Sequence, residues 1–162
     1  MKKILTVFLI GMICFSLVGC SNNSVAIGDK SEYIASDNLV SLKVKSESLT
    51  KSSVSLILEN HTDDNYIYGN YYSIEYQKKD GLWYKIIPNI KMNFNMIGYI
   101  LKANDSNEII INWEEAYGKL TSGKYRIIKE VYVESQQLEE PIDMNEFEIS
   151  QTIYVSAEFT IE

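Results

Sequence analysis

Apolar and polar residues alternate with a period of two along most of the chain after residue 38. The stretches 40–44 and 54–58 both show this period. The last stretch shows it most cleanly, with apolar residues at Ile153, Val155, Ala157, Phe159 and Ile161. Successive side chains of a β-strand point to opposite faces, so each stretch is predicted to be a strand with one buried and one solvated face.

Turn residues separate these stretches from further apolar runs. Asp80-Gly81 lies between two aromatic-rich runs and is the strongest hairpin signal in the chain. Residues 93–101 and 109–113 are predicted to be two more strands, and one helical turn is allowed at 114–118. With no other helical pattern, the sequence predicts an all-β fold, an antiparallel immunoglobulin-like β-sandwich of about seven to eight strands.

A tyrosine corner is predicted at the entry to one of these strands. Trp113 precedes a short turn, and Leu120, Gly123 and Tyr125 follow with the spacing L-x-x-G-x-Y. In such a corner the tyrosine hydroxyl hydrogen-bonds to the backbone a few residues upstream and fixes the connection between two sheets. We assign these four residues a structural role.

The strand that begins at Tyr125 carries charged residues on both of its predicted faces. Tyr125, Ile127, Val131 and Val133 are predicted to face the core, with Lys129 as the polar exception. Arg126, Glu130 and Glu134 are predicted to face the other way. The following residues, 135–146, are predicted to form an acidic loop.

The first residues of the chain predict export and lipidation. Two lysines and an apolar run are typical of a secretory signal, and Leu17-Val18-Gly19-Cys20 resembles the bacterial lipobox. This resemblance implies a diacylglyceryl group on the Cys20 thiol and cleavage before Cys20, which would give stable anchoring. We therefore expect a signal peptide at 1–19, a lipidated flexible tether at 20–37 whose later residues can pair as an edge strand, and a folded domain at 38–162. The protein would lie on the cell membrane, facing outside the cytoplasm.

Charge and composition exclude several functions. The formal charge is −7, and loss of Lys2 and Lys3 leaves 13 basic against 22 acidic side chains, or −9. Such an acidic domain lacks the basic surface that nucleic acid requires. Both cysteines precede the predicted domain and His61 is the single histidine, so zinc sites and Cys-His or Ser-His catalysis lose support. We expect no metal and no cofactor.

Two residue groups allow alternative interpretations. Tyrosines at 66, 68, 71, 72 and 76 could form a binding face, although the shared parity of Tyr68, Tyr72 and Tyr76 favours the core or sheet face. Acidic loop residues could bind calcium, but they lack the usual ligand spacing, and Glu114-Glu115 could be catalytic carboxylates only if opposed across a cleft. The acidic loop residues are Asp63, Asp64, Glu139, Glu140, Asp143 and Glu146.

Residues from about 50 to 161 resemble the bacterial Ig-like domain of lipoproteins from Gram-positive bacteria. The resemblance implies the sandwich fold and the cell-surface location, and it supplies no catalytic residue. It rests on Leu58-Glu59-Asn60, Thr62-Asp63, Tyr68-Gly69, Tyr72-Ser73-Ile74-Glu75, Trp83-Tyr84, Ile97-Gly98-Tyr99-Ile100-Leu101, Trp113, Tyr117-Gly118-Lys119-Leu120, Gly123-Lys124-Tyr125-Arg126-Ile127 and Ala157-Glu158-Phe159.

The sequence favours a non-enzymatic function. We expect a monomer that is anchored to the membrane through Cys20 and binds a protein or cell-envelope partner through loops or a sheet edge. The candidate surfaces are the 60–66 turn, the 102–107 turn and the 135–146 loop. The alternatives are a small-ligand sensor or inhibitor and, with less support, a carboxylate-based hydrolase.

Overall fold

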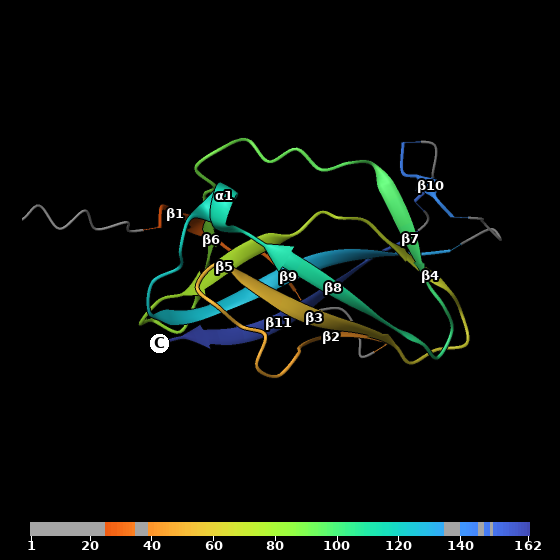
Figure 1. Cartoon of the computed structure of the whole chain (residues 1–162), viewed down its shortest axis with the longest axis horizontal. Coiled ribbons are helices and arrows are strands. Elements are labelled where there is room, and N and C mark those ends of the chain that lie inside the picture. The colour runs from red at the N-terminus through yellow and green to blue at the C-terminus, as the bar shows by residue number, and fades with distance from the viewer. Residues whose placement is uncertain (1–24, 35–38, 135–139, 146–147, 150) are drawn as a thin grey trace, which may run out of the picture.

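A computed structural model of the protein describes residues 25–34, 39–134, 140–145, 148–149 and 151–162. Its strands pair antiparallel in two sheets (Figure 1), which confirms the predicted all-β sandwich. The elements are β1 (Ile27–Lys30), β2 (Val40–Val44), β3 (Ser53–Asn60), β4 (Tyr66–Tyr68), β5 (Ser73–Gln77), β6 (Trp83–Ile86), β7 (Ile97–Leu101), β8 (Ser106–Asn112), α1 (Glu114–Tyr117), β9 (Gly123–Val133), β10 (Ile142–Asp143) and β11 (Thr152–Ile161).

The long strand β9 organises the larger sheet. One of its edges pairs with β11 along the whole length of β11, from Gly123–Ile161 to Tyr132–Thr152. The other edge is divided, because β5 pairs with residues 125–128 and β4 pairs with residues 131–133. Strands β6 and β1 continue the sheet beyond β5, and β7 and β10 continue it beyond β4.

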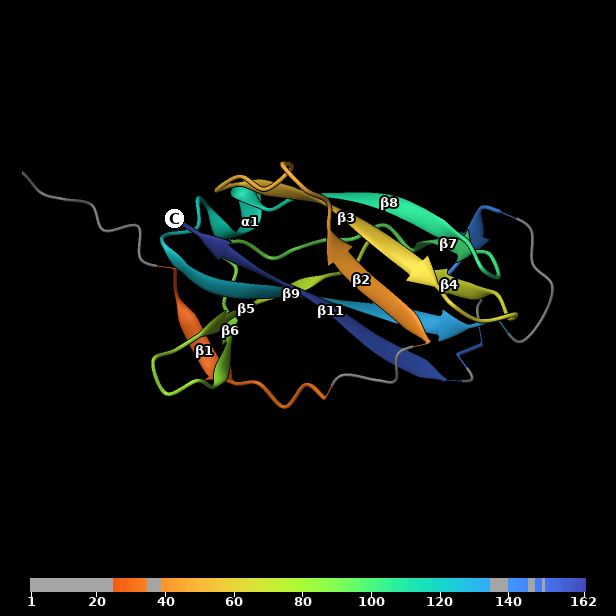
Figure 2. The same cartoon turned by 90° about the horizontal axis from the view of Figure 1, so that it is seen from below.

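The smaller sheet has the order β2-β3-β8 and covers one face of the larger one (Figure 2). The alternating apolar residues of β3 and β11 meet in the core between the sheets, as their period predicted. Among the described residues no helix is long and apolar enough to cross a membrane.

Three short strands differ from the predicted set. The aromatic run at 66–77 is split into β4 and β5, because residues 69–72 leave the edge of β9 between them. Strand β10 lies inside the predicted acidic loop, where Glu140 accepts a 2.6 Å hydrogen bond from the Ile100 backbone N–H. Strand β1 lies inside the predicted tether, whose later residues were expected to be able to form an edge strand, and it pairs with β6 at the edge of the larger sheet, so ordered structure begins before residue 38.

The corner at the start of β9 has the geometry that its spacing predicts. The Tyr125 hydroxyl donates a 2.8 Å hydrogen bond to the Thr121 carbonyl. Gly123 lies where an added Cβ would be 2.6 Å from the Tyr76 ring, which itself packs on Tyr125 with ring centroids 5.2 Å apart. A side chain at this position would therefore push the ring away.

Trp113 and Leu120 tie this corner to the neighbouring turn. The Trp113 indole Nε1 and the Leu120 backbone N–H donate hydrogen bonds of 3.0 and 2.9 Å to the Lys51 carbonyl. Phe159 stacks on Trp113 and on Tyr125, each at 5.7 Å between ring centroids. These contacts lock β8, β9 and β11 together without a disulfide.

Lys129 lies in the core, at the point along β9 between the residues that pair with β5 and those that pair with β4. Its side chain is 1% exposed, and its ammonium donates hydrogen bonds of 2.8 and 2.9 Å to the carbonyls of Gly69 and Tyr71. These carbonyls belong to the segment that leaves the sheet, so the lysine replaces the donors that a continuous ladder would supply. Burial lowers the pKa of Lys129 from 10.5 to about 8.

We predict that Tyr125→Phe lowers the free energy of unfolding by about 1–2 kcal/mol, because the Thr121 carbonyl loses its donor. Urea denaturation measures this change. Thr121→Ala is the matched control, since it keeps the carbonyl acceptor and should have a smaller effect. Equal stability of Tyr125→Phe and the wild type would contradict the role assigned to the corner.

We predict that the stability difference between the wild type and Lys129→Met depends on pH. Between the folded pKa of about 8 and the ordinary value of 10.5, the unfolded state binds more protons, so Lys129 makes the wild type relatively more stable as pH rises. The free energy of unfolding of the wild type minus that of the variant should rise by about 2 kcal/mol between pH 7 and pH 9.5. A difference independent of pH would show that Lys129 has no lowered pKa.

Candidate functional site

The outer face of the larger sheet carries a groove made of two adjoining hollows, of about 410 and 310 Å³. Tyr71 and Glu130 line both hollows and stand at their junction. We call the two hollows together the outer groove. The first hollow is lined by Ser31, Glu32, Tyr33, Ile34, Tyr71, Ser73, Glu75, Lys85, Ile128, Glu130 and Tyr154. The second is lined by Gly69, Asn70, Tyr71, Phe94, Asn95, Met96, Glu130, Tyr132 and Met144.

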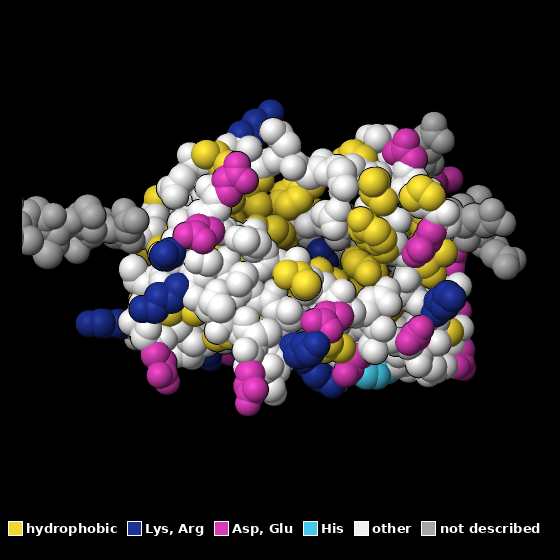
Figure 3. Space-filling view, in the orientation of Figure 1, with side chains coloured by type: hydrophobic (Ala, Val, Ile, Leu, Met, Phe, Trp, Pro, Cys, Tyr) yellow, Lys and Arg dark blue, Asp and Glu magenta, His cyan; other side chains and the backbone are white. Residues whose placement is uncertain are grey.

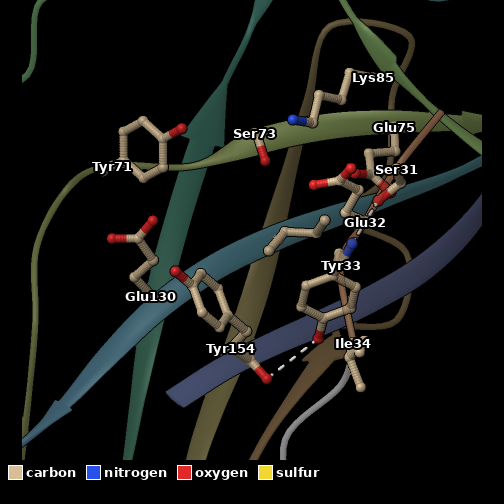
Figure 4. Close-up of a pocket in the computed structure, with 11 residues that line it drawn as sticks. Ser31, Glu32, Tyr33, Ile34, Tyr71, Ser73, Glu75, Lys85, Glu130 and Tyr154 are labelled. Atoms are coloured by element: carbon tan, nitrogen blue, oxygen red, sulfur yellow. Dashed lines mark hydrogen bonds between the residues drawn. The ribbon is translucent and has the colours of Figure 1, made fainter. Parts of the chain in front are cut away.

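Strand β9 places Glu130 and Tyr132 in this groove because even-numbered residues of the strand face outward. The Tyr132 hydroxyl donates a 2.6 Å hydrogen bond to the Glu130 carboxylate. Tyr71 and Tyr154 flank the same carboxylate, and Figure 4 shows the three side chains together on one side of the first hollow. Tyr71 and Tyr154 are 47% and 39% exposed, so both present surface to a ligand.

Burial and the nearby Glu130 carboxylate both raise the pKa of Tyr71. The pKa of Tyr132 is also raised, first by burial and then by its hydrogen bond to Glu130. Both phenols therefore keep their protons at neutral pH, and Tyr132 acts as a hydrogen-bond donor to the carboxylate. The cluster is a carboxylate set among protonated tyrosines.

A buried ion pair lies at the opposite side of the first hollow, where Glu75 is a lining residue. Arg126 donates to one Glu75 oxygen through Nε at 2.8 Å and through a terminal nitrogen at 2.6 Å. Both residues are almost fully buried, at 8% and 2% exposure, although Arg126 lies on the outward face of β9, as predicted. The reason is that Glu75 and Arg126 are direct cross-strand partners on β5 and β9, and further residues cover them.

The 31–34 segment provides part of this cover. It runs along the outer side of the larger sheet after β1 (Figure 2). The Arg126 guanidinium lies between the Tyr33 and Trp83 rings, 4.6 and 4.5 Å from their centroids, and also donates to the Ser31 hydroxyl at 3.2 Å. Tyr33 donates a 3.2 Å hydrogen bond to the Tyr154 carbonyl. The described part of the predicted tether is therefore packed on the domain and forms one wall of the groove.

Two of the loops predicted as binding surfaces, the 60–66 and 102–107 turns, are joined to each other by hydrogen bonds. Asn60 is 3% exposed and its side-chain nitrogen donates to the carbonyls of Asp64 and Lys102, at 2.7 and 2.9 Å. Asn104 donates a 2.9 Å hydrogen bond to the Asp63 carboxylate. The side chains of Asn60, Asp63 and Asn104 thus connect the two turns at the end of β3 and the start of β8.

Ser41 and His61 lie close together but do not form a catalytic triad. The Ser41 hydroxyl is 2.9 Å from His61 Nε2, and the Glu59 carboxylate lies 3.7 Å from this same nitrogen. A triad needs the carboxylate on the other ring nitrogen, where it orients the imidazole. The side chain of His61 is also half exposed, and the three residues stand outside the outer groove.

The remaining predicted site residues divide into structural and undescribed ones. Trp113, Leu120, Gly123 and Tyr125 are brought together at the corner, while Cys20, Glu139 and Glu146 lie outside the described residues. Glu114 and Glu115 are exposed on α1, where Glu114 pairs with Lys119 at 3.7 Å. Within the described ranges no group of acidic, histidine or cysteine residues could hold a metal ion.

The opposite face of the molecule differs in character. Figure 3 shows hydrophobic side chains gathered over β7 and below the connection from β6 to β7, with charged side chains around them. Ile110, on the small sheet, is 75% exposed.

Comparison with known proteins supports the fold. A family model described as a bacterial Ig-like domain matches residues 36–160. No curated protein and no solved structure matches the chain. Domains of this family are generally non-catalytic.

Proposed function

The chain belongs to the bacterial Ig-like domain family, and from this premise we propose that it is a membrane-anchored, non-enzymatic domain that binds a protein partner outside the cytoplasm. The observation that carries the proposal is the outer groove. It offers exposed aromatic rings beside a carboxylate, which are groups common at recognition surfaces. The binding surface is therefore assigned to a sheet face and not to the end loops that the sequence favoured.

A second candidate function is supported by the size of the first hollow. Its volume of about 410 Å³ falls within the range of small-molecule sites. A small-ligand sensor or inhibitor at the cell surface would use the same residues. Covalent capture of a partner at the groove distinguishes the two functions.

The proposed lipid on Cys20 would hold the domain close to the bilayer. Strand β1 begins at Ile27, so the intervening chain spans at most about 25 Å even when fully extended. The β1–β6 edge would then be nearest to the membrane, and β7 and β10, at the other end of the molecule in Figure 1, would point away from it. The hollow lined by Met96 and Met144 would open near this distal end.

We predict that Cys20→Ser releases the protein from the membrane fraction without changing its fold. The acceptor thiol is lost, while Cys20 precedes every described strand. Fractionation with immunoblotting measures the location, and the urea midpoint of the full chain measures the fold. Undiminished membrane association in the variant would contradict lipid anchoring through this residue.

We also predict that a photo-crosslinking amino acid at position 71 captures one dominant protein on intact cells. The same amino acid at position 110 is the matched control, because Ile110 is exposed on the opposite sheet. Equal capture at both positions would place the binding surface elsewhere. No capture at 71 would support the small-ligand alternative.

A further inference from the structure

Glu130 lines both hollows of the outer groove and forms no ion pair with any residue that the structure describes. The ion pairs found among the described residues involve other acids, namely Glu59, Glu75, Glu108, Glu114 and Glu158. The Glu130 carboxylate accepts a hydrogen bond from the neutral Tyr132 hydroxyl. A half-buried carboxylate in this position retains the capacity to bind a cation supplied by another molecule.

The groups around Glu130 suit an alkylammonium or guanidinium. Tyr71 and Tyr154 flank the carboxylate with partly exposed rings, and aromatic faces attract cations while their carbon atoms contact an aliphatic stem. Arg126 shows this preference within the protein, since its guanidinium lies over two aromatic rings and pairs with Glu75. Glu130 with Tyr71 and Tyr154 repeats this combination of a carboxylate and aromatic rings in the groove.

The charges that line the groove favour a cation over an anion. The first hollow is lined by three acidic residues, Glu32, Glu75 and Glu130, and by one basic residue, Lys85. Arg126 neutralises Glu75, which leaves two carboxylates for one lysine. The second hollow is lined by one charged residue, Glu130. The whole chain carries a formal charge of −7, which adds to the attraction of a basic ligand.

The second hollow suits an apolar side chain next to the cation. Phe94, Met96 and Met144 line it, and Met96 is 49% exposed. Methionine and aromatic side chains adapt to aliphatic groups of different shape. A ligand that reaches both hollows therefore needs a basic and an apolar group a short distance apart.

We propose that the outer groove binds a basic peptide segment of the protein partner, with a lysine or arginine side chain on Glu130 between Tyr71 and Tyr154 and a neighbouring apolar side chain in the hollow lined by Met96 and Met144. This inference rests on the proposed function as a partner-binding domain. It adds the chemistry of the segment that is recognised.

Fluorescence anisotropy with the full chain in zwitterionic nanodiscs tests this inference. The probe is a labelled peptide with one lysine near one leucine in an alanine-serine background, compared with the same peptide carrying norleucine in place of lysine. The lysine peptide should bind more tightly, and added salt should weaken it. Glu130→Gln should weaken it about tenfold, equivalent to about 1.4 kcal/mol.

Glu115→Gln is the matched control, because it removes the same charge from an exposed residue of α1 outside the groove, and it should leave binding unchanged. Equal binding of the norleucine peptide, or an equal effect of the two glutamine variants, would overturn the inference. If N-acetyl-lysine methylamide competes fully at the same concentration as the peptide, the assignment of a peptide ligand fails. The groove would then bind a small ammonium compound. If position 71 captures a protein but no basic peptide binds, the cation assignment fails and the proposed function stands.

Discussion

The hydrogen bonds from the Lys129 ammonium to the carbonyls of Gly69 and Tyr71 connect the core of this protein to its outer groove. Strand β9 turns its odd residues towards the core and its even residues towards the groove. The lysine therefore fixes, from inside, the segment that carries Tyr71, while the adjacent Glu130 and Tyr132 lie outside. The hydrogen bonds of Lys129 therefore position the 69–72 segment and, with it, Tyr71 of the candidate site.

The same strand depends on its corner for its place between the sheets. Tyr125 bonds to the Thr121 carbonyl, and Trp113 and Leu120 both donate to the Lys51 carbonyl. The two side-chain contacts are partly buried, and no buried side-chain nitrogen or oxygen of the described residues lacks a partner. Satisfied polar groups and close aromatic packing thus specify the fold where a disulfide is lacking within residues 25–162.

Strand alternation made most of the sandwich predictable. The inward residues of β11, the corner at Tyr125 and the helical turn at α1 follow from local pattern and spacing. Lys129 was also recognisable as a polar residue on the inward face, although its carbonyl partners lie about sixty residues away in the chain. Long-range partners of this kind leave no periodic signal.

The candidate site was not predictable for the same reason. Tyr33, Tyr71, Glu130 and Tyr154 come from four separate segments, and the register of β5, β9 and β11 brings them together. The register also explains why Arg126 is buried, because Glu75 is its direct partner. The sequence favoured binding through loops or a sheet edge, yet in the 60–66 and 102–107 turns Asn60, Asp63 and Asn104 form hydrogen bonds within and between the two turns.

The crystal structure of the Lys129→Met variant tests most directly whether this lysine positions the groove. Methionine keeps the packing volume but cannot donate to the carbonyls of Gly69 and Tyr71. The account predicts that residues 69–72 shift and Tyr71 leaves Glu130, while the pairing of β9 with β11 is retained. An unmoved Tyr71 beside Glu130 would contradict it, since the groove would then be held without the lysine.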